Sequence, residues 1–429
     1  MSDRIVLGGG CLRGEIRMPG DKSVSHRALI LGALADGKTE ALGLAPGADV
    51  RSTRSVLEAL GVKIEGSGAD ATVHGRGLGG LAAHAGELDA GNSGTTMRLM
   101  AGALAGHAFL SRLSGDASLC RRPMGRVAVP LRLMGAAVEL TKEGTAPFTV
   151  VGGELKGREY RMPVPSAQVK SAVMLAGLHA AGRTTVIEPA STRDHTERML
   201  ALFGAHAHRD GLAVSVDGGT RLTGTRVDVP GDPSSAAFWV VASALADGSE
   251  LVIRGVMANA TRTRFLDVLK RMGADVKAEP AGERAGEACV DLVVRGRRRL
   301  RATDIRASEV PGLVDEVPIL ALAAACAEGV SRFSGLDELR HKESDRLAGI
   351  AELLGGFGAK ARVDGDDLVV EGAPRLSGGC VESLDDHRLA MTGFVAGFLA
   401  RGETTVSGAE CAVISYPSFY DDFLARRVS

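Results

Sequence analysis

One sequence unit occurs six times along this chain, and this limits the possible folds more than any other property. Each copy is an apolar run of helical character that ends at glycine and is followed by a strand-like segment. The glycines are Gly37, Gly106, Gly182, Gly248, Gly329 and Gly402, with spacings of 69, 76, 66, 81 and 73 residues. A chain with 57 glycines could give such matches by chance, but the regular spacing argues for a repeated supersecondary unit.

A second pattern alternates with the first and also consists of an apolar helical run, a glycine and a short strand. Its glycines are Gly61, Gly135, Gly204, Gly273 and Gly358. Glycine directly after a helical run is typical of a helix C-terminus, because the left-handed conformation found there costs glycine little. Each unit of about 70 residues therefore contains two helices, each followed by a strand. Six units in 429 residues predict layered α/β structure, with three units in each of two domains.

Polar and charged residues gather just before the helices of the first pattern, as in GDKSVSHR (20–27) and GNSGTTMR (91–98). Cations are unfavourable at a helix N-terminus unless an anion is present, and the N-terminus itself attracts anions. We therefore expect an anion-binding site, whose cationic candidates are Lys22, Arg27, Arg98 and Arg388. The alternative is that the polar residues are ordinary N-caps. The candidate caps are Asp21, Asn92, Ser166, Asp232 and Asp386.

The segment ELRHKESDRL (338–347) has the charge spacing of a helix. Lys342 and Arg346 would share one helical face through their i,i+4 spacing, with Glu343 in the same turn. The alternative is a solvated helix whose Glu and Arg residues pair with one another.

The composition argues against several classes of function. The 51 Lys and Arg residues nearly cancel the 52 Asp and Glu residues, so we expect no nucleic-acid or membrane partner. We expect neither a signal peptide nor a membrane span, because no suitable apolar run occurs. The six scattered cysteines show no metal-binding spacing and indicate free thiols in the reducing cytoplasm. Cys120 lies beside Arg121 and Arg122, so a nucleophilic role for its thiol stays open.

Eight motifs, in order along nearly the whole chain, resemble those of the EPSP synthase family. They are GDKSVSHRALI, LDAGNSGTTMRLMAG, RRPMGR, VPSAQVKSAVMLAG, VDEVPILALAAA, LRHKESDR, DDHRLAM and YPSFYDDF. The resemblance implies a two-domain enolpyruvyl transferase fold of six βαββαβ-like repeats with the active site in an interdomain cleft. Residues 1–20 plus 232–429 would form a discontinuous domain with the acid/base and phosphoenolpyruvate-binding residues. Residues 21–231 would form the domain with most shikimate 3-phosphate-binding residues.

The family resemblance also implies a set of substrate-binding residues. Those for shikimate 3-phosphate are Lys22, Ser23, Arg27, Ser166, Ala167, Gln168, Arg193, Asp315 and Lys342. Those for phosphoenolpyruvate are Lys22, Asn92, Gly94, Thr95, Arg122, Gln168, Glu343, Arg346 and Arg388. Arginine and lysine suit the phosphate and carboxylate groups of both molecules, because charged donors make strong hydrogen bonds to anions.

The implied reaction transfers the enolpyruvyl group of phosphoenolpyruvate to the 5-hydroxyl of shikimate 3-phosphate in the shikimate pathway, towards chorismate and the aromatic amino acids. Asp315 would act as the base and Glu343 would exchange a proton with the methylene carbon, aided by Lys22. The resemblance implies no metal, no organic cofactor and a monomeric enzyme.

Three positions depart from the family pattern. His341 replaces a hydrophobic residue, Ala167 replaces the serine of many members, and Ile414 stands where many members have lysine. The missing lysine should weaken cationic coverage of phosphoenolpyruvate. Gly94 retains the small residue that leaves room for the inhibitor glyphosate, which we expect to compete with phosphoenolpyruvate.

Two other functions remain as alternatives. The related UDP-N-acetylglucosamine enolpyruvyltransferases share the six-unit architecture, but KESDR and DKSVSHR favour the shikimate enzyme. A non-catalytic binding protein on the same repeat would be expected to lack an acid, a base or a binding arginine, whereas Asp315, Glu343, Arg122 and Arg346 are all present.

Overall fold

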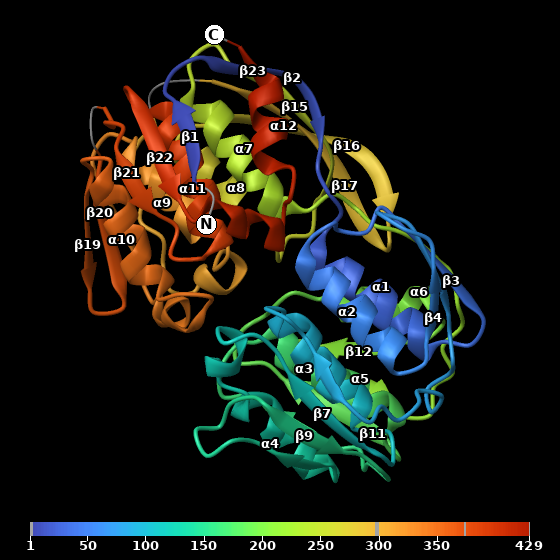
Figure 1. Ribbon diagram of the computed structural model, residues 1–429. Coiled ribbons are helices and arrows are strands. Elements are labelled where there is room, and N and C mark those ends of the chain that lie inside the picture. The colour runs from blue at the N-terminus through green and yellow to red at the C-terminus, as the bar shows by residue number, and fades with distance from the viewer. Residues whose placement is uncertain (1–2, 297–299, 373–374, 429) are drawn as a thin grey trace. The chain divides into compact units, whose positions relative to one another are not determined.

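The computed structural model describes residues 3–296, 300–372 and 375–428, which fold into two compact units (Figure 1). Unit 1 comprises Met1–Pro19, Gly231–Gly282 and Ala288–Ser429, and unit 2 comprises Gly20–Pro230 and Glu283–Glu287. The short segment Glu283–Glu287 thus belongs to unit 2, although the chain on both sides of it belongs to unit 1. Which substrate each domain binds stays a prediction.

Unit 2 contains three four-stranded sheets, each accompanied by two helices. The first has the strand order β14 (Arg226–Asp228), β3 (Lys38–Leu42), β5 (Ala71–His74) and β4 (Lys63–Glu65), with α1 (Lys22–Leu34) and α2 (Ala48–Ala59). The second has β6 (Glu87–Asp89), β7 (Leu110–Ser114), β9 (Phe148–Val151) and β8 (Ala137–Glu139), with α3 (Gly94–Leu104) and α4 (Gly125–Met134). The third has β10 (Glu159–Arg161), β11 (Arg183–Ile187), β13 (Ala213–Asp217) and β12 (Ala207–Asp210), with α5 (Ala167–His179) and α6 (His195–Leu202). In every sheet the first two strands are parallel and the other pairs are antiparallel.

Unit 1 repeats this plan with modified edges. Its largest sheet has β16 (Asp275–Arg284), β17 (Glu287–Arg295), β15 (Glu250–Met257), β2 (Cys11–Arg17) and β23 (Arg427–Val428), with α7 (Pro233–Leu245) and α8 (Arg264–Arg271). The next has β18 (Val330–Phe333), β20 (Asp367–Glu371) and β19 (Lys360–Asp364), with α9 (Val317–Ala325) and α10 (Arg346–Gly356). The last has β1 (Arg4–Leu7), β22 (Glu403–Ser407) and β21 (Cys380–Glu382), with α11 (His387–Leu399) and α12 (Phe419–Arg426). Short segments of 3-10 helix occur at η1 (Leu119–Arg121), η2 (Val310–Gly312), η3 (Asp337–His341) and η4 (Ala409–Ile414).

The α/β fold class and the sixfold repeat are confirmed, since the described residues form six sheets. The order of elements differs in detail from the expected βαββαβ. The second and third repeats of unit 2 run β, α, β, α, β, β, so the second helix follows the second strand. This order places the last two strands as an antiparallel pair that completes each sheet.

The glycine patterns marked the helix ends correctly. Every glycine of both patterns except Gly106 has positive φ, in agreement with its predicted place at a helix end. Gly106 is required for a different reason, because an added Cβ would lie 2.1 Å from Cγ of His179. This glycine therefore permits close packing of the end of α3 against the end of α5.

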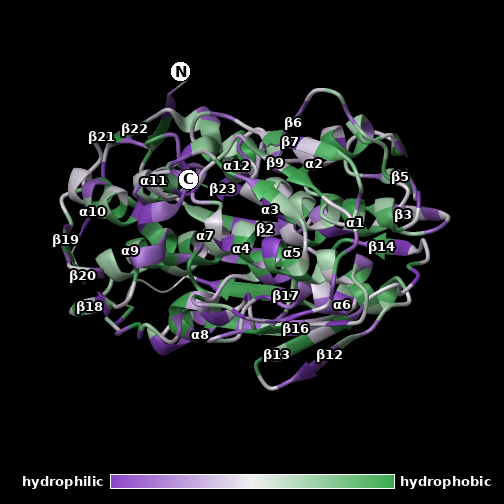
Figure 2. Cartoon of the chain, turned by 90° about the horizontal axis from the view of Figure 1, so that it is seen from below, coloured by the Kyte–Doolittle hydropathy of each residue, from purple (hydrophilic) through white to green (hydrophobic). Residues whose placement is uncertain are grey.

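The core of each unit contains helices that are buried on all sides. Every residue of α7 and of α9 is buried, and α1 is buried from Val24 to Leu34. Helices that are apolar all round lie inside a protein rather than on its surface, and Figure 2 gives the hydropathy along them. Within the described residues, no helix is both long enough and apolar enough to cross a membrane.

Candidate active site

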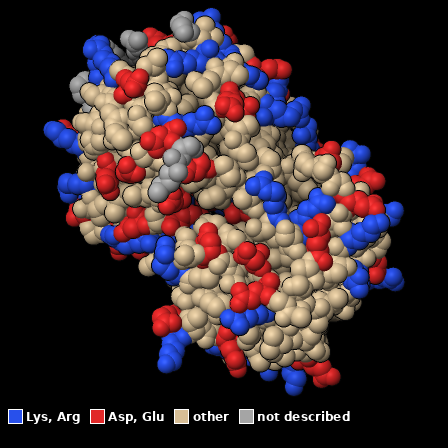
Figure 3. All heavy atoms as spheres, viewed as in Figure 1, with Lys and Arg blue, Asp and Glu red and all other residues tan. Residues whose placement is uncertain are grey.

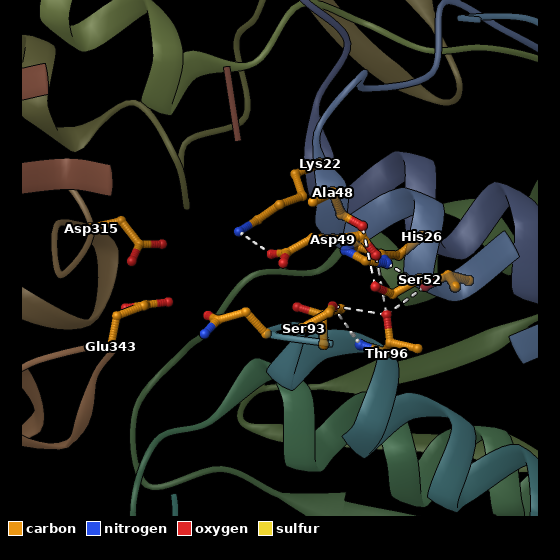
Figure 4. A network of polar contacts seen from close by, with 12 residues as sticks. Lys22, His26, Ala48, Asp49, Ser52, Ser93, Thr96, Asp315 and Glu343 are labelled. Carbon is orange, nitrogen blue, oxygen red and sulfur yellow. Dashed lines mark hydrogen bonds and ion pairs between the residues drawn. The ribbon is translucent and has the colours of Figure 1, made fainter. Parts of the chain in front are cut away.

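Lys22 is the first residue of α1 and is held by a carboxylate of α2. Its Nζ lies 2.9 Å from Oδ2 of Asp49, and the side chains are 24% and 8% exposed (Figure 4). Asp21 caps the helix, because its side chain accepts a hydrogen bond from the Val24 amide at 2.8 Å. The ammonium group is thus fixed at a helix start and remains partly open to solvent.

Arg27 lies one turn later on α1 and is almost completely buried. Its Nε donates to Thr196 at 2.7 Å, its Nη1 to the carbonyl of Ser23 at 2.9 Å, and its Nη2 to Ser171 at 2.6 Å. The guanidinium therefore connects α1 with α5 and α6. Ser23 contributes a backbone contact to this arrangement.

A chain of buried hydrogen bonds joins α1, α2 and α3 beneath Lys22 (Figure 4). His26 Nδ1 lies 2.6 Å from Thr53 Oγ1, which lies 2.7 Å from Thr96 Oγ1. Thr96 Oγ1 donates to Ser93 at 2.8 Å. Burial, with further effects of Lys22 and Arg27, lowers the pKa of His26 well below its usual value. The imidazole is therefore neutral near pH 7.

The start of α3 corrects one N-cap prediction. The cap is Ser93, which accepts from the Thr96 amide at 3.1 Å, and not Asn92. Asn92 instead accepts from Nη2 of Arg122 at 2.7 Å and donates to Asp116 at 2.7 Å. The predicted caps of α1, α5, α7 and α11 are confirmed.

Gly94 leaves space for two arginine side chains. An added Cβ would lie 2.7 Å from Nη1 of Arg98 and 3.5 Å from Nη1 of Arg122. Arg98 Nη1 donates to Gln168 at 2.5 Å, and the amide nitrogen of Gln168 donates to Thr95 at 3.0 Å. These contacts gather cations and amide groups where α3 and α5 begin.

Ser166, Ala167 and Gln168 form the N-terminal turn of α5. Ser166 caps this helix by accepting from the Val169 amide at 3.3 Å. Ala167 presents no polar side chain here, in contrast to the serine of many family members. Arg193 is half-buried in the segment just before α6.

In unit 1, Arg346 is the centre of a group of carboxylates. Its Nε lies 2.8 Å from Oδ2 of Asp386, its Nη2 2.5 Å from Oε2 of Glu343, and its Nη1 3.6 Å from Oδ1 of Asp315. Burial alone would lower the pKa of Arg346, but the three carboxylates hold it above its usual value. Asp315 and Glu343 therefore both lie beside Arg346, and Figure 4 shows the two side chains as neighbours.

Arg388 and Lys342 complete the predicted residues of unit 1. Nη2 of Arg388 lies 3.9 Å from Oδ2 of Asp315, and Arg388 is 6% exposed. Burial lowers the pKa of Lys342, nearby Asp315 opposes this change, and Arg346 adds to it. The carboxylate of Asp315 thus lies in a strongly cationic surrounding.

The predicted helical face at Lys342 and Arg346 is wrong, and so is the alternative of a solvated helix there. The 3-10 turn η3 ends at His341, Lys342 is extended, and α10 begins only at Arg346. Asp345 caps α10 by accepting from the Ala348 amide at 3.1 Å. The i,i+4 spacing was misleading because the buried pairing of Arg346 with Asp386 fixes the arginine independently of a helix at 342–345.

Two carboxylates that the family resemblance did not include support the predicted cations. Asp49 pairs with Lys22, and Asp386, predicted only as a cap, also pairs with Arg346. A sequence signal existed for Asp386, since a DDHR segment places acid beside a helix start. No local signal identifies Asp49, which lies 27 residues from its partner.

The nucleophilic role left open for Cys120 stays a prediction. Cys120 lies in η1 and its thiol donates to the carbonyl of Gly115 at 3.4 Å. Burial raises the pKa of Cys326 and of Cys411 to about 12. Ile414, at the position where many family members have lysine, ends η4.

One group of side chains in the described residues has the composition of a metal site: Asp194, His195 and Glu287. Arg198 Nε lies 2.8 Å from Oδ2 of Asp194 and 3.4 Å from Oε2 of Glu287. A guanidinium so close to both carboxylates competes with any cation, so this group does not fit a metal.

On the face drawn in Figure 3, acidic and basic side chains are mixed.

The comparisons with known proteins identify the family. The sequence profile of EPSP synthase (3-phosphoshikimate 1-carboxyvinyltransferase) matches residues 6–423. A 3-phosphoshikimate 1-carboxyvinyltransferase from Halorhodospira halophila is 51% identical over 425 residues, covering 99% of this chain and 95% of that protein. One from Gloeobacter violaceus is 51% identical over 418 residues, covering 97% and 96%. A solved structure of EPSP synthase from Acinetobacter baumannii superimposes with a TM-score of 0.88 at 42% identity, covering 100% of this chain and 98% of that one. The resemblance found in the eight motifs is confirmed, and the chain belongs to the EPSP synthase family.

Proposed function

We propose that this protein transfers the enolpyruvyl group of phosphoenolpyruvate to the 5-hydroxyl of shikimate 3-phosphate, releasing phosphate and 5-enolpyruvylshikimate 3-phosphate. The observation that carries the proposal is the pair of carboxylates of Asp315 and Glu343 beside the buried guanidinium of Arg346. Addition and elimination need one group that accepts a proton and one that donates it. An adjacent cation is what an anionic substrate requires.

Shikimate 3-phosphate would be bound by polar groups at the starts of α1 and α5, with further contacts from unit 1. Its proposed partners are Lys22, Ser23, Arg27, Ser166, Ala167, Gln168, Arg193, Asp315 and Lys342. The fixed guanidinium of Arg27 and the amide of Gln168 support this assignment, because preformed donors bind phosphate without a large ordering cost. Ala167 can contribute only its backbone.

Phosphoenolpyruvate would be bound by arginines whose orientation is already set by neighbouring acceptors. Asn92 holds Arg122, while Asp386 and Glu343 hold Arg346. Lys22, Gly94, Thr95, Gln168 and Arg388 complete this proposed set. Bidentate arginines match both the phosphate and the carboxylate of this substrate.

In the proposed mechanism, the 5-hydroxyl oxygen of shikimate 3-phosphate bonds to C2 of phosphoenolpyruvate while Asp315 accepts the hydroxyl proton. Glu343 donates a proton to C3 in the same step. The tetrahedral intermediate then loses phosphate while a proton returns from C3 to Glu343, and Lys22 assists at the anionic groups. Arg346 favours the ionised form of Glu343. Donation from Glu343 therefore requires a compensating anion, which the substrate phosphate can provide. The assignment of residues from both units to the same two substrates, and the expected cleft, stay predictions.

We further propose that the protein acts as a monomer in the cytoplasm. The six cysteines are thiols that form no disulfide bond with one another, which suits a reducing compartment.

The proposed function is tested by phosphate release from purified protein with phosphoenolpyruvate and shikimate 3-phosphate in the presence of a metal chelator. Release should require shikimate 3-phosphate and should fall at least about a hundredfold in Asp315→Ala and in Glu343→Gln. Release only with UDP-N-acetylglucosamine as acceptor would assign the other transferase activity. No release with either acceptor would favour a binding protein.

A further inference from the structure

Lys170, in the SAQVKSA segment, is fully buried and has no role in the proposed chemistry. Its side chain is 0% exposed, and its Nζ lies 3.1 Å from Oε2 of Glu188 and 2.8 Å from Oε1 of Glu197. Burial of an ammonium group is unfavourable unless it is paired and hydrogen-bonded. The two carboxylates provide that compensation.

A fourth residue balances the charge of this buried cluster. Nη2 of Arg209 lies 2.8 Å from Oε1 of Glu197 and 3.4 Å from Oε2 of Glu188. Two cations therefore face two carboxylates, and the four residues come from α5, the end of β11, α6 and β12. A buried ion pair contributes little to stability compared with apolar packing, so its directional contacts need another explanation.

The contacts of the cluster lead to two proposed substrate-binding segments. The Lys170 amide donates to the carbonyl of Ser166 at 3.0 Å, within the first turn of α5. On the other side, Oε1 of Glu188 accepts from the Thr192 amide at 3.2 Å and also from its hydroxyl. Thr192 directly precedes Arg193. Only two linked side chains, Lys170 and Glu188, thus separate the Ser166 turn from the segment of Arg193.

We infer that Lys170 and Glu188 are positioning residues that hold Arg193 and the Ser166–Gln168 turn in place for one phosphorylated ring substrate. The inference rests on the proposed function and deepens it. A ligand with fixed distances between its anionic and hydroxyl groups binds well only if its partners are fixed too. A misplacement of ~1 Å in a binding group can reduce turnover about a hundredfold.

The test is calorimetric binding of shikimate 3-phosphate to the full chain, together with the KM for each substrate. Glu188→Gln keeps an oxygen that can accept from Thr192 but removes the charge that attracts Lys170. It should raise the Kd for shikimate 3-phosphate about tenfold or more and raise the KM for phosphoenolpyruvate much less, because only Gln168 of the displaced residues is also proposed to bind phosphoenolpyruvate. Arg183→Gln is the matched control, because it removes only an exposed ion pair between Arg183 of β11 and Asp217 of the neighbouring β13, and it should leave both constants unchanged.

A double variant separates positioning from a purely structural role. Lys170→Met with Glu188→Gln leaves Arg209 paired with Glu197, so the remaining cluster is charge-balanced and should fold even if a single variant does not. Weak shikimate 3-phosphate binding in a double variant of normal melting temperature would support the inference. Binding within about twofold of the unaltered protein, or an equal rise in both KM values, would overturn it. Failure of the unaltered protein to bind shikimate 3-phosphate would instead reject the proposed function.

Discussion

Replacement of Asp386 should destabilise unit 1 more than any surface change. This carboxylate is 0% exposed, pairs with Arg346 through two oxygens at 2.8 and 3.2 Å, and accepts from the Arg388 amide at 2.8 Å. Removal of one partner of a buried ion pair costs ~3–5 kcal/mol, and we expect the lower end because Glu343 and Asp315 still face Arg346. Asp386→Asn, which can still cap α11, should therefore cost ~3 kcal/mol. Asp386→Ala also loses the cap and should cost ~4 kcal/mol.

The only tryptophan of the chain allows this loss to be measured in the correct unit. Trp239 is fully buried in unit 1, and its ring centroid lies 5.1 Å from that of Phe423, which also contacts Phe394 of α11. Urea unfolding followed by tryptophan fluorescence therefore reports on the surroundings of α11.

The control for the Asp386 measurement is an exposed acid of the same unit. Asp364 pairs with Arg332 where both side chains are nearly half exposed, so Asp364→Asn should cost less than ~1 kcal/mol. If both Asp386 variants also cost less than ~1 kcal/mol, Arg346 does not depend on this partner and the reasoning is refuted.

Three further predictions concern unit 2. Gly94→Ala places a methyl group against Arg98, so it should raise the inhibition constant of glyphosate and the KM for phosphoenolpyruvate; unchanged competition kinetics would contradict this placement. Asn92→Ala removes the shortest of three hydrogen bonds from Arg122 and should raise the KM for phosphoenolpyruvate about tenfold with a small change in melting temperature, because a hydrogen bond to a charged group is worth ~1.5–3 kcal/mol. Burial lowers the pKa of His179 from 6.5 to about 4, so the unfolded chain binds the extra proton first and stability falls as the pH drops through this range. The loss in the free energy of unfolding is at most ~3 kcal/mol, and His179→Leu should remove it. The measurement is urea unfolding followed by circular dichroism at pH 7.5 and 4.5, and an unchanged pH dependence in the variant would exclude His179 as the source of the loss.

Features governed by the local backbone could be predicted from the sequence. Gly135, for example, ends α4 with φ of 116°, and Asp21 caps α1 as expected. Both follow from the conformational preference of a single residue type. The α/β repeat could be predicted for the same reason, since it is a series of such signals.

Features governed by distant partners could not be predicted in this way. The partners Lys22 and Asp49 are 27 residues apart, and His195 and Glu287 are 92 residues apart. The N-cap of α3 was predicted one residue too early, at Asn92 instead of Ser93. The side chain of Asn92 accepts a hydrogen bond from Arg122 instead. Periodicity also misjudged Lys342, where tertiary pairing of Arg346 determines the backbone.

The pairing of β1 with β22 imposes an order on the appearance of structure during synthesis. Leu7 of β1 lies opposite Glu403 of β22, and β2 pairs with β15. In unit 2, by contrast, both neighbours of β3 have been synthesised once the chain reaches residue 228, where β14 ends. At a synthesis rate of ~5–20 residues per second, ~20–80 s pass between the synthesis of β1 and the synthesis of its partner strand. All of unit 2, including Glu283–Glu287, is synthesised during this interval. Strand β1 therefore stays without its partner strand in the growing chain until Glu403–Ser407 has been synthesised.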